Sequence, residues 1–233
     1  GLGNSFGISS ETNNNIQTDG LSAYWDAAYK KSYPRSGTAW TDIVGANNGT
    51  LTNGPTFNSD GGGSIVFDGS NDHTTIANLN PTDYKTAFTF SCWANFDDVS
   101  GDNASNAQIL FGRHQGNERM YIGIAGANCK MGIGNAFQLN VVHGMSAEQW
   151  YNICITRSGT TNTYYVNLVS KTTMTSSWSG TSTTTVNIGC MNETGTPVQF
   201  TAGKIALVKL YTRALSIGEI TQNYNAQKQR FGL

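Results

Sequence analysis

The acidic side chains are the first residues to test for chemistry, because cleavage of a glycosidic bond uses two carboxyl groups about 5–9 Å apart. The 233-residue chain has five glutamates, and none has a second carboxylate within four positions. Glu219 follows Ser216 by three residues, a spacing typical of a helix capping box. Carboxylates could still converge from different strands, but no local motif supplies a pair. The sequence therefore predicts a protein that is not an enzyme.

The three histidines, His73, His114 and His143, are far apart in the chain and lie in stretches typical of loops. A zinc site or a histidine base would need them to converge without a supporting motif. We expect them to be surface histidines. The chain also has no GxSxG elbow, no phosphate-binding loop and no dinucleotide fingerprint between a strand and a helix.

One short loop carries the oxygen ligands that calcium prefers. In the stretch DGSND, Asp68, Asn71 and Asp72 are the candidate ligands. The same residues can instead build an Asx turn between two strands, and we favour that simpler interpretation. Residues 97–103, DDVSGDN, form a second stretch of the same kind. The sequence thus predicts no required cofactor and leaves calcium as the one open candidate.

Tryptophan rings are the candidate platforms for carbohydrate, because sugars stack on aromatic faces. Trp178 lies in the loop-like stretch TSSWSGTS, so we expect it to be exposed. Trp93 alternates with Phe90 and Phe96 and therefore points to the opposite side of its strand, where it is either exposed or packed against a neighbouring face. Trp178 and Trp93 are the predicted sugar contacts.

The elements that must position these residues are strands. Charged residues make up 12% of the chain, about half the usual share, and there are 27 glycines.

The net charge is −1 without a basic patch, which argues against binding nucleic acid. No apolar run approaches the eighteen residues of a membrane-spanning helix, so we expect no membrane partner.

Period-two alternation marks individual strands. It is clearest in FTFSCWANF, residues 88–96, and recurs at Met120, Ile122 and Ile124. The runs WYNICITR and TYYVNLVS, separated by SGTTN, predict a hairpin.

Two segments look helical: residues 143–150, with Ser146 as cap, and a C-terminal helix that begins at Ser216 and docks an apolar stripe on the sheet.

The four cysteines have no metal-binding spacing, and we expect buried thiols, with disulfides as the alternative in a secreted protein.

Three blocks of sequence carry a resemblance to a known family. They are residues 20–58 with GSIVFDGSND after them, residues 149–167 (QWYNICITRSGTTNTYYVN), and residues 203–232. In this order they resemble the laminin-G-like, concanavalin A-like lectin/glucanase jelly-roll domains. The first and third blocks are most similar to the versions found in virion proteins of marine tailed bacteriophages. The resemblance implies an all-β fold: an antiparallel two-sheet jelly-roll sandwich with a short C-terminal helix outside.

The sequence predicts an extended N-terminal arm over residues 1–20 and a jelly-roll domain over residues 21–233. The expected function is that of a non-enzymatic structural or adhesion protein on the virion surface, either a capsid decoration or a tail or fibre component. Its partners would be other virion proteins or copies of itself, with a host surface glycan as a further candidate. The alternative is a carbohydrate-binding, lectin-type module of a bacterial surface or secreted protein.

Overall fold

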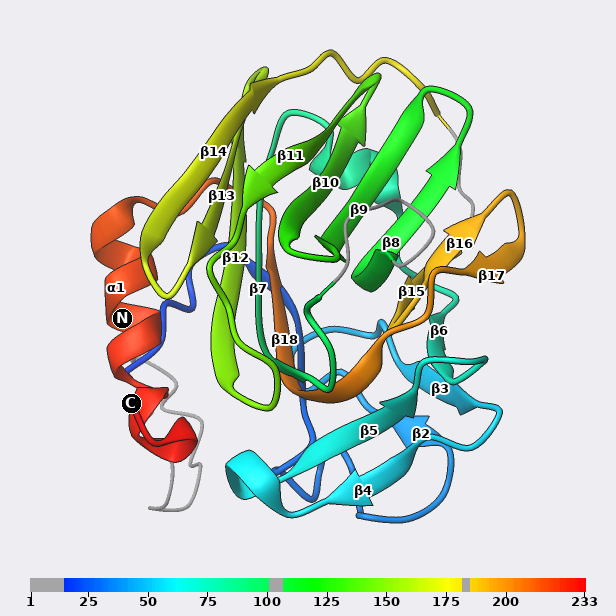
Figure 1. Ribbon diagram of the computed structural model, residues 1–233. Coiled ribbons are helices and arrows are strands. Elements are labelled where there is room, and N and C mark those ends of the chain that lie inside the picture. Colours follow the sequence, from blue (N-terminus) through cyan, green and yellow to red (C-terminus); the bar gives the residue numbers. More distant parts are fainter. Residues whose placement is uncertain (1–14, 101–106, 182–184) are drawn as a thin grey trace, which may run out of the picture.

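Two antiparallel sheets packed face to face form the molecule (Figure 1), as the sequence predicted. The computed structural model describes residues 15–100, 107–181 and 185–233. Between the sheets lies a continuous apolar core. One short α-helix, α1 (Ile217–Asn225), packs outside the sandwich.

The first sheet has eight strands and contains the two longest strands of the described residues, which pair with each other at its centre. Across the sheet the strands are β14 (Val169–Thr175), β13 (Thr161–Val166), β12 (Trp150–Ser158), β7 (Ala87–Phe96), β18 (Ala202–Tyr211), β5 (Ser64–Asp68) and β4 (Thr56–Asn58), and β1 (Leu21–Asp26) also pairs with β18.

The second sheet has ten strands, including a small hairpin attached to its middle. Across the sheet they are β11 (Ala136–Val142), β10 (Asn128–Gly134), β9 (Glu118–Ala125), β8 (Ala107–Gln115), β15 (Val186–Ile188), β6 (His73–Ile76), β3 (Gly49–Thr52) and β2 (Ala39–Trp40). The hairpin of β16 (Met191–Glu193) and β17 (Thr196–Val198) joins β8 through a parallel pairing. The described ranges also contain three 3-10 helices, η1 (Asp60–Gly62), η2 (Pro81–Tyr84) and η4 (Lys228–Phe231).

Alternation along the strands builds the core. Phe88, Phe90 and Cys92 of β7 all point between the sheets, as the period-two pattern predicted. Phe90 meets Phe111 of β8 with ring centroids 5.1 Å apart, which joins the two sheets. Burial of one such side chain contributes roughly 1.5–3 kcal/mol, so this layer is a main source of stability.

The local predictions differ in outcome. The β12–β13 hairpin is confirmed, with a tight turn at residues 159–160. The predicted helical turn capped by Ser146 is wrong, because residues 143–149 form no helix. Glu148 instead adopts a positive φ of 58°. Its backbone N–H donates to the Phe96 carbonyl at 2.7 Å, so the segment closes against the end of β7.

All four cysteines are buried and unpaired, as predicted. Cys92 and Cys154 lie on neighbouring strands but on opposite faces: Cys92 is in the inter-sheet core, and Cys154 is in the cluster beneath α1. A disulfide between them is therefore excluded by direction. Burial raises the pKa of Cys154 to about 12 and that of Cys129 to about 11, so both thiols stay protonated and act as small apolar groups.

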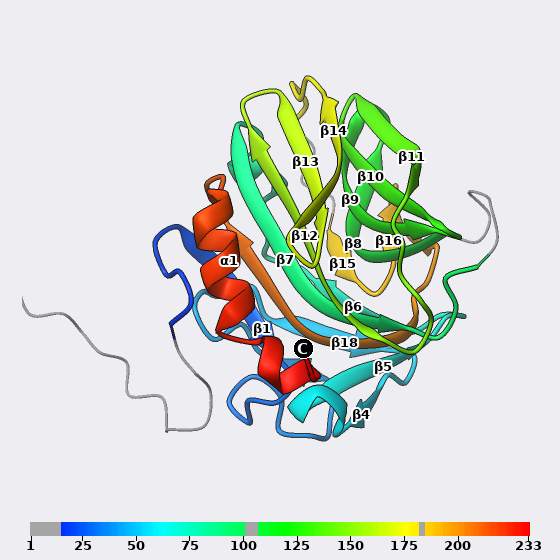
Figure 2. The same ribbon diagram turned by 60° about the vertical axis from the view of Figure 1, so that its left-hand side comes forward.

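The C-terminal helix is confirmed with its capping box. The Ser216 backbone N–H donates to Glu219 Oε2 at 2.8 Å, and the Glu219 N–H donates to Ser216 Oγ at 3.4 Å. Leu215 and Ile220 pack beneath α1, while Tyr224 stacks on Trp93 with ring centroids 5.4 Å apart. Figure 2 shows α1 lying on the outer face of the first sheet, where this apolar stripe docks.

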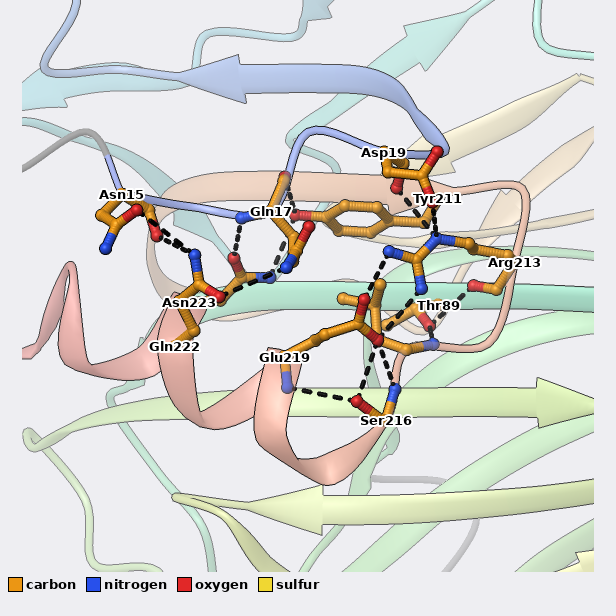
Figure 3. Close-up of polar contacts among 11 residues, drawn as sticks. Asn15, Gln17, Asp19, Thr89, Tyr211, Arg213, Ser216, Glu219, Gln222 and Asn223 are labelled. Carbon is orange, nitrogen blue, oxygen red and sulfur yellow. Dashed lines mark hydrogen bonds and ion pairs between the residues drawn. The ribbon is translucent and has the colours of Figure 1, made fainter.

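Residues 15–20, here called the N-terminal strap, lie against α1 and the end of β18 (Figure 3). The Gln17 N–H donates to Asn223 Oδ1 at 2.7 Å, and Tyr211 donates its hydroxyl hydrogen to the Gln17 carbonyl at 3.1 Å. Arg213 bridges Asp19, at 2.8 Å, and Glu219, at 2.6 Å. The strap is thus tied to the C-terminal segment. The rest of the predicted arm, residues 1–14, lies outside the described residues.

Candidate functional site

Both predicted tryptophan platforms lie inside the molecule. Trp93 is fully buried under the C-terminal segment and stacks on Phe231 with ring centroids 4.1 Å apart. Trp178 is 8% exposed and belongs to the inter-sheet core, so the expectation that it is exposed was wrong. The reason is the backbone: Asn135 and Ser177 exchange two hydrogen bonds of 2.9 Å, which hold the segment across the end of the sandwich. Neither ring offers a face on which a sugar could stack.

The predicted calcium loop has the geometry of an Asx turn. Asp68 Oδ1 accepts hydrogen bonds from the backbone N–H groups of Ser70, Asn71 and Asp72 at 2.8–3.3 Å. The Ser70 N–H contributes most to lowering the pKa of Asp68, whereas burial raises the pKa of Asp72. No cluster of three or more His, Cys, Asp or Glu in the described part of the chain could hold a metal ion. Asp102 and Asn103 of the second candidate stretch lie outside that part.

Two of the three histidines are not surface groups, contrary to expectation. His73 and His143 are buried, and His143 accepts the Met145 N–H on its Nδ1 at 2.9 Å while its Nε2 lies 2.9 Å from the Gly126 carbonyl. His114 is half-buried on β8, where its Nδ1 lies 2.9 Å from Glu193 Oε1 of β16. This last contact belongs to the arrangement that the sequence did not reveal.

A row of alternating aromatic and glycine positions crosses four strands on the outer face of the second sheet. Phe137 of β11 is paired with Gly132 of β10, Gly132 with Tyr121 of β9, and Tyr121 with Gly112 of β8. Met120 and Ile122, on either side of Tyr121, point into the inter-sheet core, so the row points away from it. The two aromatic side chains therefore share one outward surface.

The glycines let Tyr121 lie flat on the sheet. A Cβ atom on Gly132 would stand 2.2 Å from Tyr121 Cζ, and one on Gly112 would stand 2.6 Å from Tyr121 Cβ. The ring packs with Ile109, Met191 and Val198, so the β16–β17 hairpin covers part of it. Burial raises the pKa of Tyr121 and keeps its hydroxyl protonated.

Charged side chains surround the ring. Lys130 Nζ lies 5.6 Å from the Tyr121 ring centroid and donates to Gln199 Oε1 at 2.8 Å. Burial lowers the pKa of Lys130 to about 8. The His114 ring meets the edge of Tyr121 at 6.0 Å and holds Glu193. These contacts fix the directions of the Lys130 amine, the His114 ring and the Glu193 carboxylate beside the aromatic row.

The accessible end of the row is Phe137, which is 56% exposed. The Arg119 guanidinium lies over its ring, 5.6 Å from the centroid. We call His114, Arg119, Tyr121, Lys130, Phe137 and Glu193 the outer-face cluster. An exposed ring beside a guanidinium can stack on the apolar face of a sugar while the guanidinium donates hydrogen bonds to its hydroxyls.

Sequence reasoning missed this cluster because it searched for tryptophan. The sequence did contain a signal, a second alternation in the stretch KMGIGNAF. Its outward positions are Lys130, Gly132 and Gly134. On the preceding strand, Tyr121 is paired with Gly132 and Arg119 with Gly134. Glycine in a strand interior often marks a close approach of another group. The stretch therefore contained a reason to place a ring over it.

A laminin G-type family model, described as the concanavalin A-like lectin/glucanases superfamily, matches residues 68–221. The chain belongs to this superfamily. No curated protein matches its sequence. The match confirms the family part of the resemblance, together with the fold that it implies.

Solved structures agree on the fold. Trypanosoma rangeli sialidase in complex with 2,3-difluorosialic acid is similar at 14% identity and a TM-score of 0.67, over 92% of this chain and 34% of the sialidase. Domain 4 of the arabinanase AbnA from Geobacillus stearothermophilus, bound to arabinotriose, is similar at 14% identity and a TM-score of 0.62, over 89% of this chain and 98% of that domain. The receptor binding domain of botulinum neurotoxin C/D mosaic serotype is similar at 15% identity and a TM-score of 0.64, over 90% of this chain and 51% of the neurotoxin chain. The chain thus spans about a third of the sialidases it resembles.

Proposed function

We propose that this protein is a non-enzymatic adhesion domain that binds carbohydrate through the outer-face cluster. The observation that carries the proposal is the exposed Phe137 ring with Arg119 beside it, on a surface where glycines leave room for the Tyr121 ring. Glu193 is the single carboxylate in the cluster, and it is held by His114. Glycoside hydrolysis uses two carboxyl groups, so binding is the role that this chemistry favours.

The similar proteins give the proposal its ligand class. The arabinanase domain is bound to arabinotriose, and the neurotoxin domain is a receptor binding domain. The first is matched over almost its whole length. Their low identity means that no residue role is carried over, and the outer-face cluster is argued from this chain alone.

A glycan panel with one variant and one matched control tests the proposal. Wild type is expected to bind at least one oligosaccharide with saturation, and Phe137→Ala to lose at least tenfold in affinity. Val142→Ala is the control, because Val142 lies on the same strand and is 65% exposed. The proposal is overturned if wild type binds no glycan, with or without calcium, or if Phe137→Ala binds as well as wild type.

Display on a virion is the setting that we propose for this domain. The positions of the N-terminal strap and the outer-face cluster support this setting. The strap and α1 lie on the outer face of the first sheet, whereas the cluster lies on the second sheet. A particle or cell attached through the strap side would leave the cluster facing outward. Mass spectrometry of purified virus particles checks this setting, which fails if the protein is absent from them; a bacterial surface or secreted module is then the alternative.

A further inference from the structure

A lysine and a glutamine side chain meet in a buried space beneath the C-terminal segment. Lys209 of β18 is 0% exposed, and its Nζ donates to Oε1 of Gln227 at 2.7 Å. Gln227 lies between α1 and η4 and is also buried. Because the carbonyl bond is about 1.2 Å long, the lysine nitrogen stands close to the electrophilic Cδ atom of the amide.

The amide has further polar partners at both of its ends. Trp93 Nε1 donates to the same Oε1 atom at 3.3 Å. The amide nitrogen, Nε2, donates to the Tyr24 hydroxyl at 3.4 Å, and Tyr24 in turn donates to Asp26 Oδ2 at 2.9 Å. A donor thus faces the oxygen that would gain charge during an attack on Cδ, and a hydroxyl faces the nitrogen that would leave.

The environment favours an uncharged, nucleophilic amine. Burial lowers the pKa of Lys209 to about 7, with opposing contributions from Cys154, Asp26 and Cys92 and a supporting one from Arg230. Arg230 is itself paired with Asp26 at 2.8 Å, which reduces the attraction between Asp26 and a protonated lysine. A desolvated lysine near neutrality is the usual form of a lysine nucleophile.

We propose that Lys209 and Gln227 join in an intramolecular isopeptide bond. The Nζ lone pair attacks Cδ, and the developing negative charge on Oε1 is stabilised by the Trp93 Nε1–H. The bond from Cδ to Nε2 then breaks. One proton passes from Nζ to the departing nitrogen, for which the Tyr24 hydroxyl is within reach. The products are a secondary amide and one ammonia molecule, so atoms and charge balance without any other reactant.

The bond would fasten the C-terminal segment to the centre of the first sheet. It would link positions 18 residues apart and hold the segment that carries Phe231 over Trp93. A cross-link of this kind restricts the unfolded chain in the way that a disulfide does. No disulfide supplies such a cross-link here, because all four cysteines are buried and unpaired.

Intact mass spectrometry of the purified protein is the experiment. Wild type, incubated at pH 8, is expected to be lighter than its sequence by one ammonia molecule, and tandem spectra of a digest should show a branched peptide joining Lys209 to Gln227. Lys209→Met should have its full sequence mass. Lys204→Met, a partly exposed lysine on the same strand, is the matched control and should keep the loss.

One side reaction gives the same mass and must be separated. Asn48 and Asn53 are exposed and each precedes a glycine, and a succinimide at either also releases ammonia. A loss that persists in Lys209→Met, or that maps to Asn48 or Asn53, overturns the isopeptide bond. So does a wild-type protein that keeps its full mass after prolonged incubation. Because none of these outcomes involves Phe137 or a glycan, the test is independent of the proposed function.

Discussion

The Tyr121 ring lies directly over the Cα atom of Gly132, so closely that a methyl group at this glycine would stand 2.2 Å from Cζ. The two residues are paired across β9 and β10. The flat ring in turn places Lys130 and His114 around it. The position of Gly132 therefore controls both local packing and the form of the outer-face cluster.

Gly132→Ala tests this control. We expect it to lower the free energy of unfolding by about 1–3 kcal/mol, because the ring must move out of a packed position, and to weaken glycan binding. Urea denaturation and a binding titration measure the two effects. Gly218→Ala in α1 is the control: a Cβ atom there would stand 3.9 Å from Ser216 Oγ, an ordinary contact, and the substitution should stabilise the protein by roughly 0.5–1 kcal/mol. Equal stability of Gly132→Ala and wild type would contradict the packing argument.

Calcium is testable at the Asx turn. Asp68→Ala removes the acceptor of three backbone N–H groups, and we expect a loss of about 1 kcal/mol in stability. If the turn is the whole role of Asp68, the melting temperature of wild type is the same in calcium and in chelator, and the loss in the variant is equal in both. A rise in the wild-type melting temperature with calcium, absent from Asp68→Ala, would instead show a calcium site.

Lys130 gives a prediction for alkaline pH. Burial lowers its pKa from 10.5 to about 8 in the folded protein. Below pH 8 both states carry the proton and folding bears the full cost of burying the charge. Between pH 8 and 10.5 the unfolded chain binds more protons, so this residue makes stability rise with pH. Lys130→Met should therefore gain less stability than wild type between pH 7 and pH 9, as followed by urea denaturation.

The comparison with wild type is essential for Lys130, because the cysteines act in the opposite direction. Their pKa values are raised by burial, to about 12 for Cys154, so the unfolded chain loses thiol protons first and stability falls above about pH 9. Only the difference between wild type and Lys130→Met isolates the lysine. Parallel pH profiles for the two proteins would contradict the lowered pKa.

Much of the fold was predictable from local pattern. The alternation through Phe88, Phe90 and Cys92 depends on one strand and one apolar core, and both are properties of a short window. The capping box at Ser216 and Glu219 is equally local. Such features are visible in the sequence because the residues that make the contact are three or fewer positions apart, or repeat every second position.

The site was not predictable in the same way. Whether Trp178 is exposed depends on the hydrogen bonds of its neighbour Ser177 to Asn135, which lies 42 residues before Ser177. The contact between His114 and Glu193 spans 79 residues, and that between Lys130 and Gln199 spans 69. The outer-face cluster thus arises where the β16–β17 hairpin meets β8–β10, and no window of the sequence contains it.

Arg213 and Glu219 supply the prediction for acid pH. The guanidinium donates from Nη1 and Nη2 to the two carboxylate oxygens at 3.0 and 2.6 Å. This pairing, with the Ser216 N–H, lowers the pKa of Glu219 from 4.5 to about 2. The carboxylate therefore stabilises the fold above pH 4.5 and loses that effect as pH falls toward 2. Glu219→Gln should cost roughly 1 kcal/mol at pH 7, with a difference from wild type that shrinks by pH 3. Thermal denaturation from pH 7 to pH 3 measures it, and Glu148→Gln, in the loop before β12, is the control. A difference that stays constant with pH would mean that the carboxylate's charge does not anchor α1.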